Sequence, residues 1–194
     1  MNAGGGVAVL ATPPGVPQPC AGDWKHGPYR ETLALKDGRS VLLRPAHHRD
    51  APALQRLFAE LSPRSRLLRF HGALKRLPDA AARSLSTQVA ARHIALVALS
   101  PGAQDEPRLR AEARYAVDDD GEAEFGIAVA DDWQGLGLGR ALMTRLVVHA
   151  RDSGLDSLIG NVMPGNEAML QLLRAFGAEI RSDAAEVQGR IRLR

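Results

Sequence analysis

The segment Ala128–Arg151 constrains this chain more than any other stretch, because it combines a strand, a glycine-rich turn and a long helix. Its sequence is AVADDWQGLGLGRALMTRLVVHAR, with glycine at every second position from 135 to 139. Glycine has no Cβ, so a ligand can approach the main chain closely. The first amides of the following helix have no intrahelical partner, and the helix dipole adds partial positive charge there. The segment therefore predicts a site that binds phosphate or pyrophosphate through backbone amides.

Two common phosphate-binding motifs do not fit the spacing of these glycines. A dinucleotide fingerprint needs G-x-G-x-x-G after a strand, and here the third glycine would fall at Arg140 or Leu142. A nucleotide P-loop needs G-x-x-x-x-G-K-[ST], and no lysine follows these glycines. The spacing therefore excludes both signatures in this segment.

Length and composition restrict the class of protein. The 194 residues suffice for one domain with a core that needs no disulfide. Cys20 is the only cysteine, which rules out an intrachain disulfide and a zinc site of several cysteines. The formal charge of +3 is too small to indicate a nucleic-acid partner by itself. No apolar run approaches the ~18 residues of a membrane helix and no secretory signal is evident, so we expect a cytoplasmic protein without a membrane partner.

The chain divides into a short tail and one domain. Residues 1–28 are rich in glycine and proline and have few ways to bury apolar surface, so we expect a flexible N-terminal tail. In the single domain expected over residues 29–194, apolar spacing predicts the order β-β-α-α-α-β-β-β-α-β-α-β-β. This mixed order favours an α+β fold with a mostly antiparallel central sheet flanked by helices.

Local patterns indicate the ends and buried faces of these elements. Asp37-Gly38 predicts a tight turn between two strands, and the apolar run His93–Leu99 predicts a central strand. Ser62 and Asn166 precede helical segments as N-caps, and Gly154 follows the helix of the glycine-rich segment as a C-cap. The last helix is expected to bury four apolar side chains, Met169, Leu172, Leu173 and Phe176.

Two charged runs admit more than one interpretation. The helix Pro63–Phe70 carries three arginines; an exposed face is the favoured interpretation, and a contact to substrate or bound phosphate is the alternative. The triplet Asp118–Asp120 lies before Gly121, which favours a solvated hairpin loop. A metal site is the weaker interpretation of the triplet, because the spaced oxygen ligands of a calcium loop are missing.

Three stretches resemble one enzyme superfamily. The run Gln134–Gly139 fits the pattern Q/R-x-x-G-x-G/A and resembles the acyl-CoA pyrophosphate loop of the GNAT superfamily of N-acetyltransferases. Asn166 with Phe176-Gly177 is similar to the N-x(9)-F/L-G segment that ends the GNAT core. The segment Leu61–Phe70 looks like the S-P-x-S-R-x-x-R-F stretch of bacterial protein-lysine acetyltransferase domains. The order of elements also resembles the GNAT fold, so the resemblance spans roughly residues 31–194.

The resemblance implies an acetyl-CoA-dependent N-acetyltransferase, with acetyl-CoA as co-substrate and no metal. In such enzymes the loop amides hold the pyrophosphate, and the strand before the loop pairs with the pantetheine like an added strand. An asparagine at the start of the last helix helps to hold the CoA arm. The cofactor-binding residues expected here are Ile127, Val129, Gln134, Gly135, Gly137, Leu138, Gly139, Arg140 and Asn166.

The resemblance also implies direct attack of an amine on the thioester, which requires a base because an ammonium is not a nucleophile. Glu124 falls where the protein-lysine subgroup carries its catalytic glutamate, and Glu122 and Glu112 are the alternatives. A backbone amide near Val129 is the expected donor to the oxyanion. Many GNAT enzymes carry a tyrosine seven residues after the asparagine as general acid, but Leu173 occupies that position here. The general acid is therefore unassigned.

The acceptor stays open among a small amine, a peptide N-terminus and a protein lysine. The absent tyrosine keeps an alternative function open, a non-catalytic acyl-CoA-binding or sensing module of the same fold. Nucleic acid is not an expected partner. A monomer and a homodimer are both compatible with the sequence.

Overall fold

The computed structural model describes residues 29–72, 74–87, 92–102, 106–182 and 187–194. The predicted tail, residues 1–28, lies outside them together with Cys20. Among the described residues, no helix has the length and apolar character needed to span a membrane. One hydrophobic core cluster extends from Tyr29 to Leu193, and the division into tail and domain stays a prediction.

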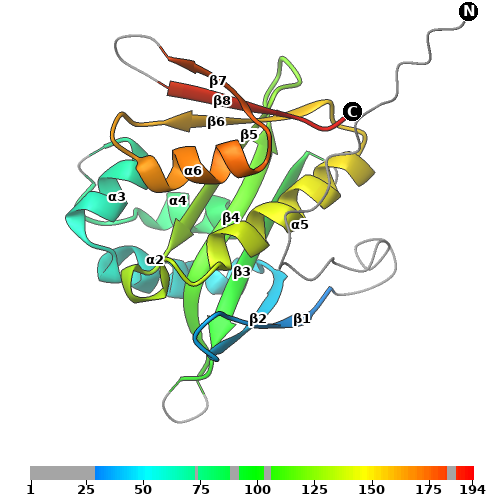
Figure 1. The fold of residues 1–194 in the computed structure, drawn as a ribbon. Coiled ribbons are helices and arrows are strands. Elements are labelled where there is room, and N and C mark those ends of the chain that lie inside the picture. Colours follow the sequence, from blue (N-terminus) through cyan, green and yellow to red (C-terminus); the bar gives the residue numbers. More distant parts are fainter. Residues whose placement is uncertain (1–28, 73, 88–91, 103–105, 183–186) are drawn as a thin grey trace, which may run out of the picture.

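The described residues form an eight-stranded sheet with helices packed against it (Figure 1). The strands are β1 (Glu31–Ala34), β2 (Ser40–Pro45), β3 (His93–Ser100), β4 (Arg108–Val117), β5 (Ala123–Val129), β6 (Ser157–Val162), β7 (Glu179–Ser182) and β8 (Val187–Arg192). The helices are α2 (Ala51–Glu60), α3 (Pro63–Phe70), α4 (Asp79–Ser86), α5 (Leu138–Asp152) and α6 (Glu167–Ala175), with 3-10 turns η1 (His48–Asp50) and η3 (Asp131–Trp133). The strand order is β1-β2-β3-β4-β5-β6-β8-β7, and every neighbouring pair is antiparallel except β5 and β6. The predicted α+β class with a mixed, mostly antiparallel sheet is confirmed.

Strand β4 shows that different helices cover the two faces of the sheet. Glu112 accepts a hydrogen bond from Arg69 of α3, whereas the Tyr115 hydroxyl lies 2.8 Å from Nδ1 of His149 on α5. Successive side chains of a strand point to opposite faces. Helix α3 therefore lies against one face and α5 against the other, and Figure 1 shows α5 in front of the sheet with α4 behind it.

Local sequence signals mark the ends of several elements correctly. Gly38 turns the β1–β2 hairpin at a φ of 85°, and β3 is buried along nearly its whole length. The Ser62 side chain caps α3 by accepting a hydrogen bond from the Ser65 amide. After α5, Gly154 adopts a φ of 78° and the next amide donates to the Ala150 carbonyl oxygen. These contacts are those of a helix C-cap.

The buried face of α6 differs from the sequence expectation. Leu173 and Phe176 are buried as predicted, and Leu170 joins them in the core. Met169 and Leu172 are only half-buried, because they line a cleft. Apolar spacing identifies a helix face that avoids water, but it does not separate a core contact from a cleft lining.

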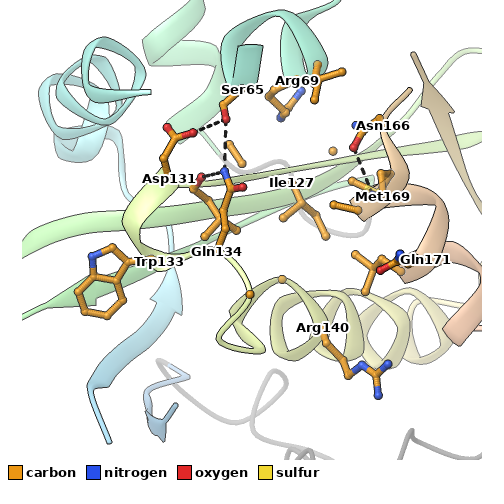
Figure 2. A pocket seen from close by; sticks show the side chains of 18 of the residues that line it. Ser65, Arg69, Ile127, Asp131, Trp133, Gln134, Arg140, Asn166, Met169 and Gln171 are labelled. Atoms are coloured by element: carbon orange, nitrogen blue, oxygen red, sulfur yellow. Dashed lines mark hydrogen bonds between the residues drawn. The ribbon is translucent and has the colours of Figure 1, made fainter. Parts of the chain in front are cut away.

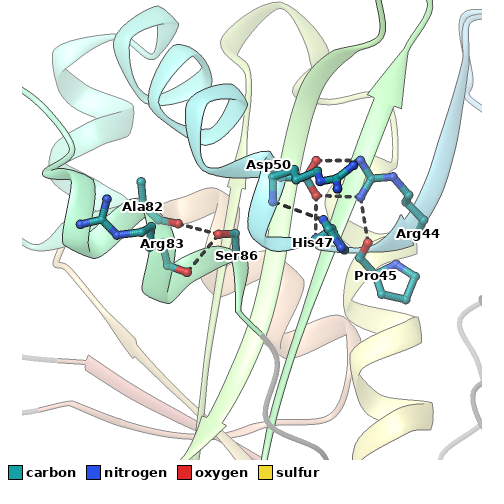
Figure 3. Close-up of polar contacts among 8 residues, drawn as sticks. Arg44, Pro45, His47, Asp50, Ala82, Arg83 and Ser86 are labelled. Atoms are coloured by element: carbon teal, nitrogen blue, oxygen red, sulfur yellow. Dashed lines mark hydrogen bonds and ion pairs between the residues drawn. The ribbon is translucent and has the colours of Figure 1, made fainter.

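An ion pair fixes the path of the chain from β2 into α2 (Figure 3). Arg44 donates from both terminal nitrogens to the two carboxylate oxygens of Asp50, each at 2.7 Å. The same carboxylate accepts the His47 amide at 2.7 Å. Burial opposes ionisation of Asp50, but these donors hold its pKa below the ordinary value. In the same view, the buried Ser86 hydroxyl closes α4 by donating to two backbone carbonyl oxygens of that helix.

Candidate active site

Strands β5 and β6 separate, and their separation opens a gap in the sheet. They run parallel and are paired in register only at Glu124 and Ile159. The Ala130 amide donates to the Arg110 carbonyl oxygen of β4. Because peptide groups of a strand alternate in direction, those of Ile127 and Val129 point away from β4 and toward the gap.

A cleft of about 1000 Å³ occupies this gap. It is bordered by the end of β1, helix α3, the glycine-rich loop, β6 and the first turns of α6 (Figure 2). Nine of the ten site residues expected from the sequence line it: Glu124, Ile127, Val129, Gln134, Gly135, Gly137, Gly139, Arg140 and Asn166. The Leu138 side chain is 1% exposed and packs in the core instead, so only its backbone belongs to the loop.

The glycine-rich loop adopts a backbone that favours glycine and leaves its amides open. Gly135 and Gly137 have φ values of 74° and 93°, in the left-handed region that residues with a Cβ rarely adopt. Gly137 is the N-cap of α5 and carries no capping side chain. Within the described part of the chain, no protein acceptor takes the amides of Gly135, Gly137, Leu138, Gly139 and Arg140. Such a row of open amides at a helix start suits anionic oxygens.

Side chains tie this loop to the start of α3 (Figure 2). Gln134 donates from Nε2 to the Val129 carbonyl oxygen at 3.1 Å and to the Ser65 hydroxyl at 3.3 Å. The Asp131 carboxylate accepts the Ser62 amide at 2.8 Å, the Ser62 hydroxyl at 2.9 Å and the Ser65 hydroxyl at 2.6 Å. Burial opposes ionisation of Asp131, but these hydrogen bonds, Ser65 foremost, hold its pKa below the ordinary value. The loop and α3 are thus held in a fixed relation.

Helix α3 forms one side of the cleft, and its arginines have different environments. Arg69 donates from Nε and Nη2 to Glu112 at 3.1 and 2.7 Å. Its guanidinium lies against Gly126, where a Cβ would come within 2.6 Å of the Arg69 Cζ atom. Arg64 stays exposed and donates to the Gly165 carbonyl oxygen at 3.2 Å. The interpretation of these arginines as an exposed face is therefore wrong for Arg69.

The three glutamates considered as the base differ in position. Glu124 lines the cleft and is exposed. Glu122 accepts a hydrogen bond from Arg190 at 2.7 Å and is absent from the described cleft lining. Glu112 is 3% exposed; burial opposes its ionisation, but the charge of Arg69 holds its pKa below the ordinary value. A buried, ion-paired carboxylate is a poor proton acceptor, so the geometry favours Glu124.

Leu173 occupies the position at which many GNAT enzymes carry a tyrosine, and its side chain has no proton to donate. It is fully buried, and a Cβ on Gly189 of β8 would come within 2.5 Å of its Cδ1 atom.

Asn166 caps α6, since its side-chain oxygen accepts a hydrogen bond from the Met169 amide at 3.2 Å (Figure 2). The predicted capping role of Asn166 is confirmed, and its contact with CoA stays a prediction.

The acidic triplet shapes a turn, as the sequence predicted. The Asp118 carboxylate accepts the Glu122 amide at 2.8 Å, and Gly121 turns the chain at a φ of 84°. Among the described residues, no group of three or more His, Cys, Asp or Glu side chains is placed to hold a metal ion.

Residues 33–36 of the β1–β2 hairpin also line the cleft, although no sequence pattern predicts a functional role for this hairpin. Arg39, at the end of the hairpin, donates to the Asp132 carbonyl oxygen at 2.9 Å. Its Cζ atom also lies 4.1 Å from the centre of the Trp133 ring. These contacts join residues more than ninety positions apart, so no local pattern reveals them.

Comparison with known proteins agrees with this geometry. The model of the acetyltransferase (GNAT) family matches residues 70–178. Acetyltransferase PA5475 of Pseudomonas aeruginosa is 34% identical over 147 residues, which cover 74% of this chain and 77% of that protein. The GNAT domain of S. lividans PAT has a TM-score of 0.75 at 23% identity, covering 84% of this chain and 97% of that chain. The yncA protein of Salmonella typhimurium, solved with its cofactor acetyl-CoA, has a TM-score of 0.62 at 18% identity. The match covers 84% of this chain and 95% of that chain.

The family match spans more than half of the chain, and the P. aeruginosa relative extends along most of it. The structural neighbours show the same fold. The resemblance to the GNAT superfamily and the expected enzyme class are confirmed, while the individual residue roles and the cellular location stay predictions. The chain belongs to the acetyltransferase (GNAT) family and is an N-acetyltransferase.

Proposed function

We propose that this chain transfers an acetyl group from acetyl-CoA to an amine acceptor within the β5–β6 cleft, with Glu124 as the general base. One observation carries the proposal: the open amides of the glycine-rich loop and the Glu124 carboxylate line the same cleft. The loop supplies an anion site, and the exposed carboxylate supplies a proton acceptor. These are the two groups that acetyl transfer from a CoA thioester requires.

The residues present fit the cofactor. The pyrophosphate accepts hydrogen bonds from the amides of Gly135, Gly137, Leu138, Gly139 and Arg140. Space for it is available, since nothing lies within 4 Å of the Cβ positions built on Gly135 and Gly139. The peptide groups of Ile127 and Val129 then pair with the pantetheine as an added strand. Asn166, which borders the cleft at the start of α6, is the remaining expected contact.

The chemistry then follows from a few groups of the chain. Acetyl-CoA supplies the acetyl group as an activated thioester. Glu124 accepts a proton from the acceptor ammonium, directly or through water, so that the amine nitrogen attacks the carbonyl carbon. The Val129 amide stabilises the negative charge that develops on the carbonyl oxygen. The C–S bond then breaks and CoA leaves as a thiolate without a side-chain acid, which the ordinary thiol pKa of about 8.5 permits. The second proton of the attacking nitrogen passes to this thiolate or to water, and a neutral amide is left.

The acceptor reaches Glu124 from the side of the cleft that α3 borders. Glu124, Gly126 and Ala128 share the sheet face on which α3 lies, because Arg69 of α3 contacts Gly126 on that face. A protein lysine is the finer hypothesis for the acceptor. It is supported by the likeness of Leu61–Phe70 to protein-lysine acetyltransferase domains and by the fold neighbour S. lividans PAT.

The substitution Glu124→Gln tests the proposal. Loss of the base should lower turnover by roughly 10²–10⁴-fold while the dissociation constant for acetyl-CoA stays within about twofold. Turnover is measured as thiol release with small amines and lysine peptides, and binding by calorimetry. Glu122→Gln is the matched control, because this glutamate lies two residues away on the same face, is absent from the described cleft lining and should not alter turnover.

Three outcomes separate the parts of the proposal. Unchanged turnover in Glu124→Gln would remove the base assignment. A wild-type protein that binds acetyl-CoA but releases no thiol with any amine would support the non-catalytic alternative. Absence of acetyl-CoA binding to the wild-type protein would overturn the proposed function itself.

A further inference from the structure

Lys36, one of only three lysines in the chain, lies beside the glycine-rich loop. It lies in the turn between β1 and β2 and lines the cleft. Its Cε atom lies 3.8 Å from the position that a Cβ on Gly137 would occupy. The ammonium is one bond beyond this atom, so the side chain brings a full positive charge to the start of α5.

The turn between β1 and β2 is held against the glycine-rich loop and the residues just before it by three contacts. The Lys36 amide donates to the Leu136 carbonyl oxygen, with a nitrogen–oxygen distance of 3.4 Å. Arg39 donates to the Asp132 carbonyl oxygen at 2.9 Å and stacks over the buried Trp133 ring. An arginine over an indole ring is an attractive cation–π contact. The position of Lys36 is therefore fixed by the fold at its backbone.

The start of the hairpin is fixed to the helix that follows the loop. Arg145, on α5, is fully buried and donates from Nε and Nη2 to the Glu31 carboxylate of β1. Burial disfavours the charged guanidinium, but the hydrogen bonds and charge of Glu31 raise the pKa of Arg145. Hairpin, loop and helix thus form one connected unit around the anion site.

The Lys36 charge has no acidic partner among the described residues. The adjacent carboxylate, Asp37, is paired with Arg39 at 2.6 Å instead. None of the ion pairs formed within the described ranges includes Lys36. An ammonium on a flexible stem is a good point-charge partner for phosphate oxygens.

We infer that Lys36 binds the pyrophosphate of acetyl-CoA through its ammonium group, opposite the amides of the glycine-rich loop. This inference rests on the proposed binding of acetyl-CoA at that loop. The hairpin lies outside residues 70–178, which the family model covers. Lys36 is therefore a cofactor contact supplied by the N-terminal hairpin of this chain, and it adds charge to a site that the loop builds from backbone.

The experiment compares CoA with 3′-dephospho-CoA, because CoA carries two kinds of phosphate that could meet a lysine. Both dissociation constants are measured by calorimetry for the wild type, Lys36→Met and Lys36→Arg. Lys36→Met should weaken both ligands about tenfold, corresponding to about 1.4 kcal/mol, and Lys36→Arg should restore most of the affinity. Lys75→Met is the matched control, since Lys75 is exposed and absent from the described cleft lining; it should change neither constant.

Two results would overturn the inference. Weaker binding of CoA alone would assign Lys36 to the 3′-phosphate, and unchanged binding of both ligands would remove it from the site. A wild-type protein that binds neither ligand would instead refute the proposed function. Thermal unfolding of each variant checks that the substitution, made at an exposed position, leaves the fold intact.

Discussion

The two sides of the β5–β6 cleft are built in different ways. The glycine-rich loop presents backbone amides, and none of its residues from Gly135 to Arg140 needs a polar side chain to do so. The α3 side depends on side chains that meet partners from distant parts of the chain, such as Arg69 with Glu112. The loop therefore depends on a backbone conformation, and the α3 side depends on particular partner side chains.

This difference separates ligand binding from stability. Replacing a loop glycine alters the space and charge that an anion meets, in a region with little packing to lose. Replacing a partner of α3 leaves a buried polar group without its hydrogen bond, which costs folding free energy. Substitutions should therefore disturb the two regions independently, with the largest effects on stability at the α3 side.

Glu112→Gln should produce the largest loss of stability. The substitution removes the charge that faces the Arg69 guanidinium under α3, where Glu112 is 3% exposed. Breaking a buried ion pair by removing one partner costs about 3 kcal/mol of unfolding free energy, measured by urea denaturation. Glu122→Gln breaks the more exposed pair with Arg190 and should cost less than about 1 kcal/mol. Equal losses in the two variants would contradict the account of the α3 side.

The same ion pair predicts how stability depends on pH. Burial disfavours the Glu112 carboxylate, but the Arg69 charge holds its pKa below the value of the unfolded chain. The stabilisation is therefore present above the unfolded glutamate pKa of about 4.3 and is lost as the pH falls through the lower folded value. Denaturation curves between pH 7 and pH 3 should fall more steeply for the wild type than for Glu112→Gln. Parallel curves would show that Glu112 does not titrate as described.

Gly126→Ala and Gly139→Ala place the same methyl group on the two sides of the cleft. At Gly126 the methyl carbon would lie 2.6 Å from the Arg69 Cζ atom, so the guanidinium must move away from Glu112. We expect a loss of about 1–2 kcal/mol of unfolding free energy. At Gly139 nothing lies within 4 Å, and alanine is the better helix former by about 1 kcal/mol, so stability should not fall. A loss of stability at Gly139 would mean that the loop is packed like the α3 side.

Asp131→Asn tests the junction of the two regions. The asparagine side chain keeps one acceptor oxygen, so part of the contact with Ser62 and Ser65 is lost. A partly exposed site of this kind should lose about 1 kcal/mol, measured by thermal unfolding. Ser65→Ala removes the donor instead, and the double variant should lose less than the sum of the two single losses. Full additivity would mean that the two side chains act independently.

Much of the fold could be predicted from the sequence, because its signals are local. Apolar spacing, Gly38, Ser62 and Gly154 indicate where strands and helices begin and end. The glycine-rich loop is also local, since its backbone requirement appears as glycine spacing within six residues. The position of Glu124 in a cleft, however, came from the resemblance to the GNAT superfamily and not from its spacing.

The features that could not be predicted depend on partners far away in the chain. Apolar and polar residues alternate along β4, so Glu112 lies on the face opposite the apolar side chains. Residues on such a face are typically exposed to solvent, but α3 covers Glu112 in the structure. Arg145 lies on the apolar stripe of α5 as a fully buried cation. It is paired with Glu31, which lies 114 residues earlier in the sequence. Lys36 lies beside Gly137 because the hairpin folds back onto the loop. None of these neighbours follows from a short window of sequence.

Calorimetric titration of acetyl-CoA into the wild type and Gly137→Glu tests the central claim most directly. Gly137 has a φ of 93° and the substitution places a carboxylate at the proposed anion site. Gly121→Glu is the matched control, because Gly121 has a φ of 84° in the β4–β5 turn and is absent from the described cleft lining. We predict one-to-one binding to the wild type and to Gly121→Glu, weakened at least ~100-fold, or about 2.7 kcal/mol, in Gly137→Glu. Equal binding to all three proteins would contradict the assignment of the glycine-rich loop as the pyrophosphate site.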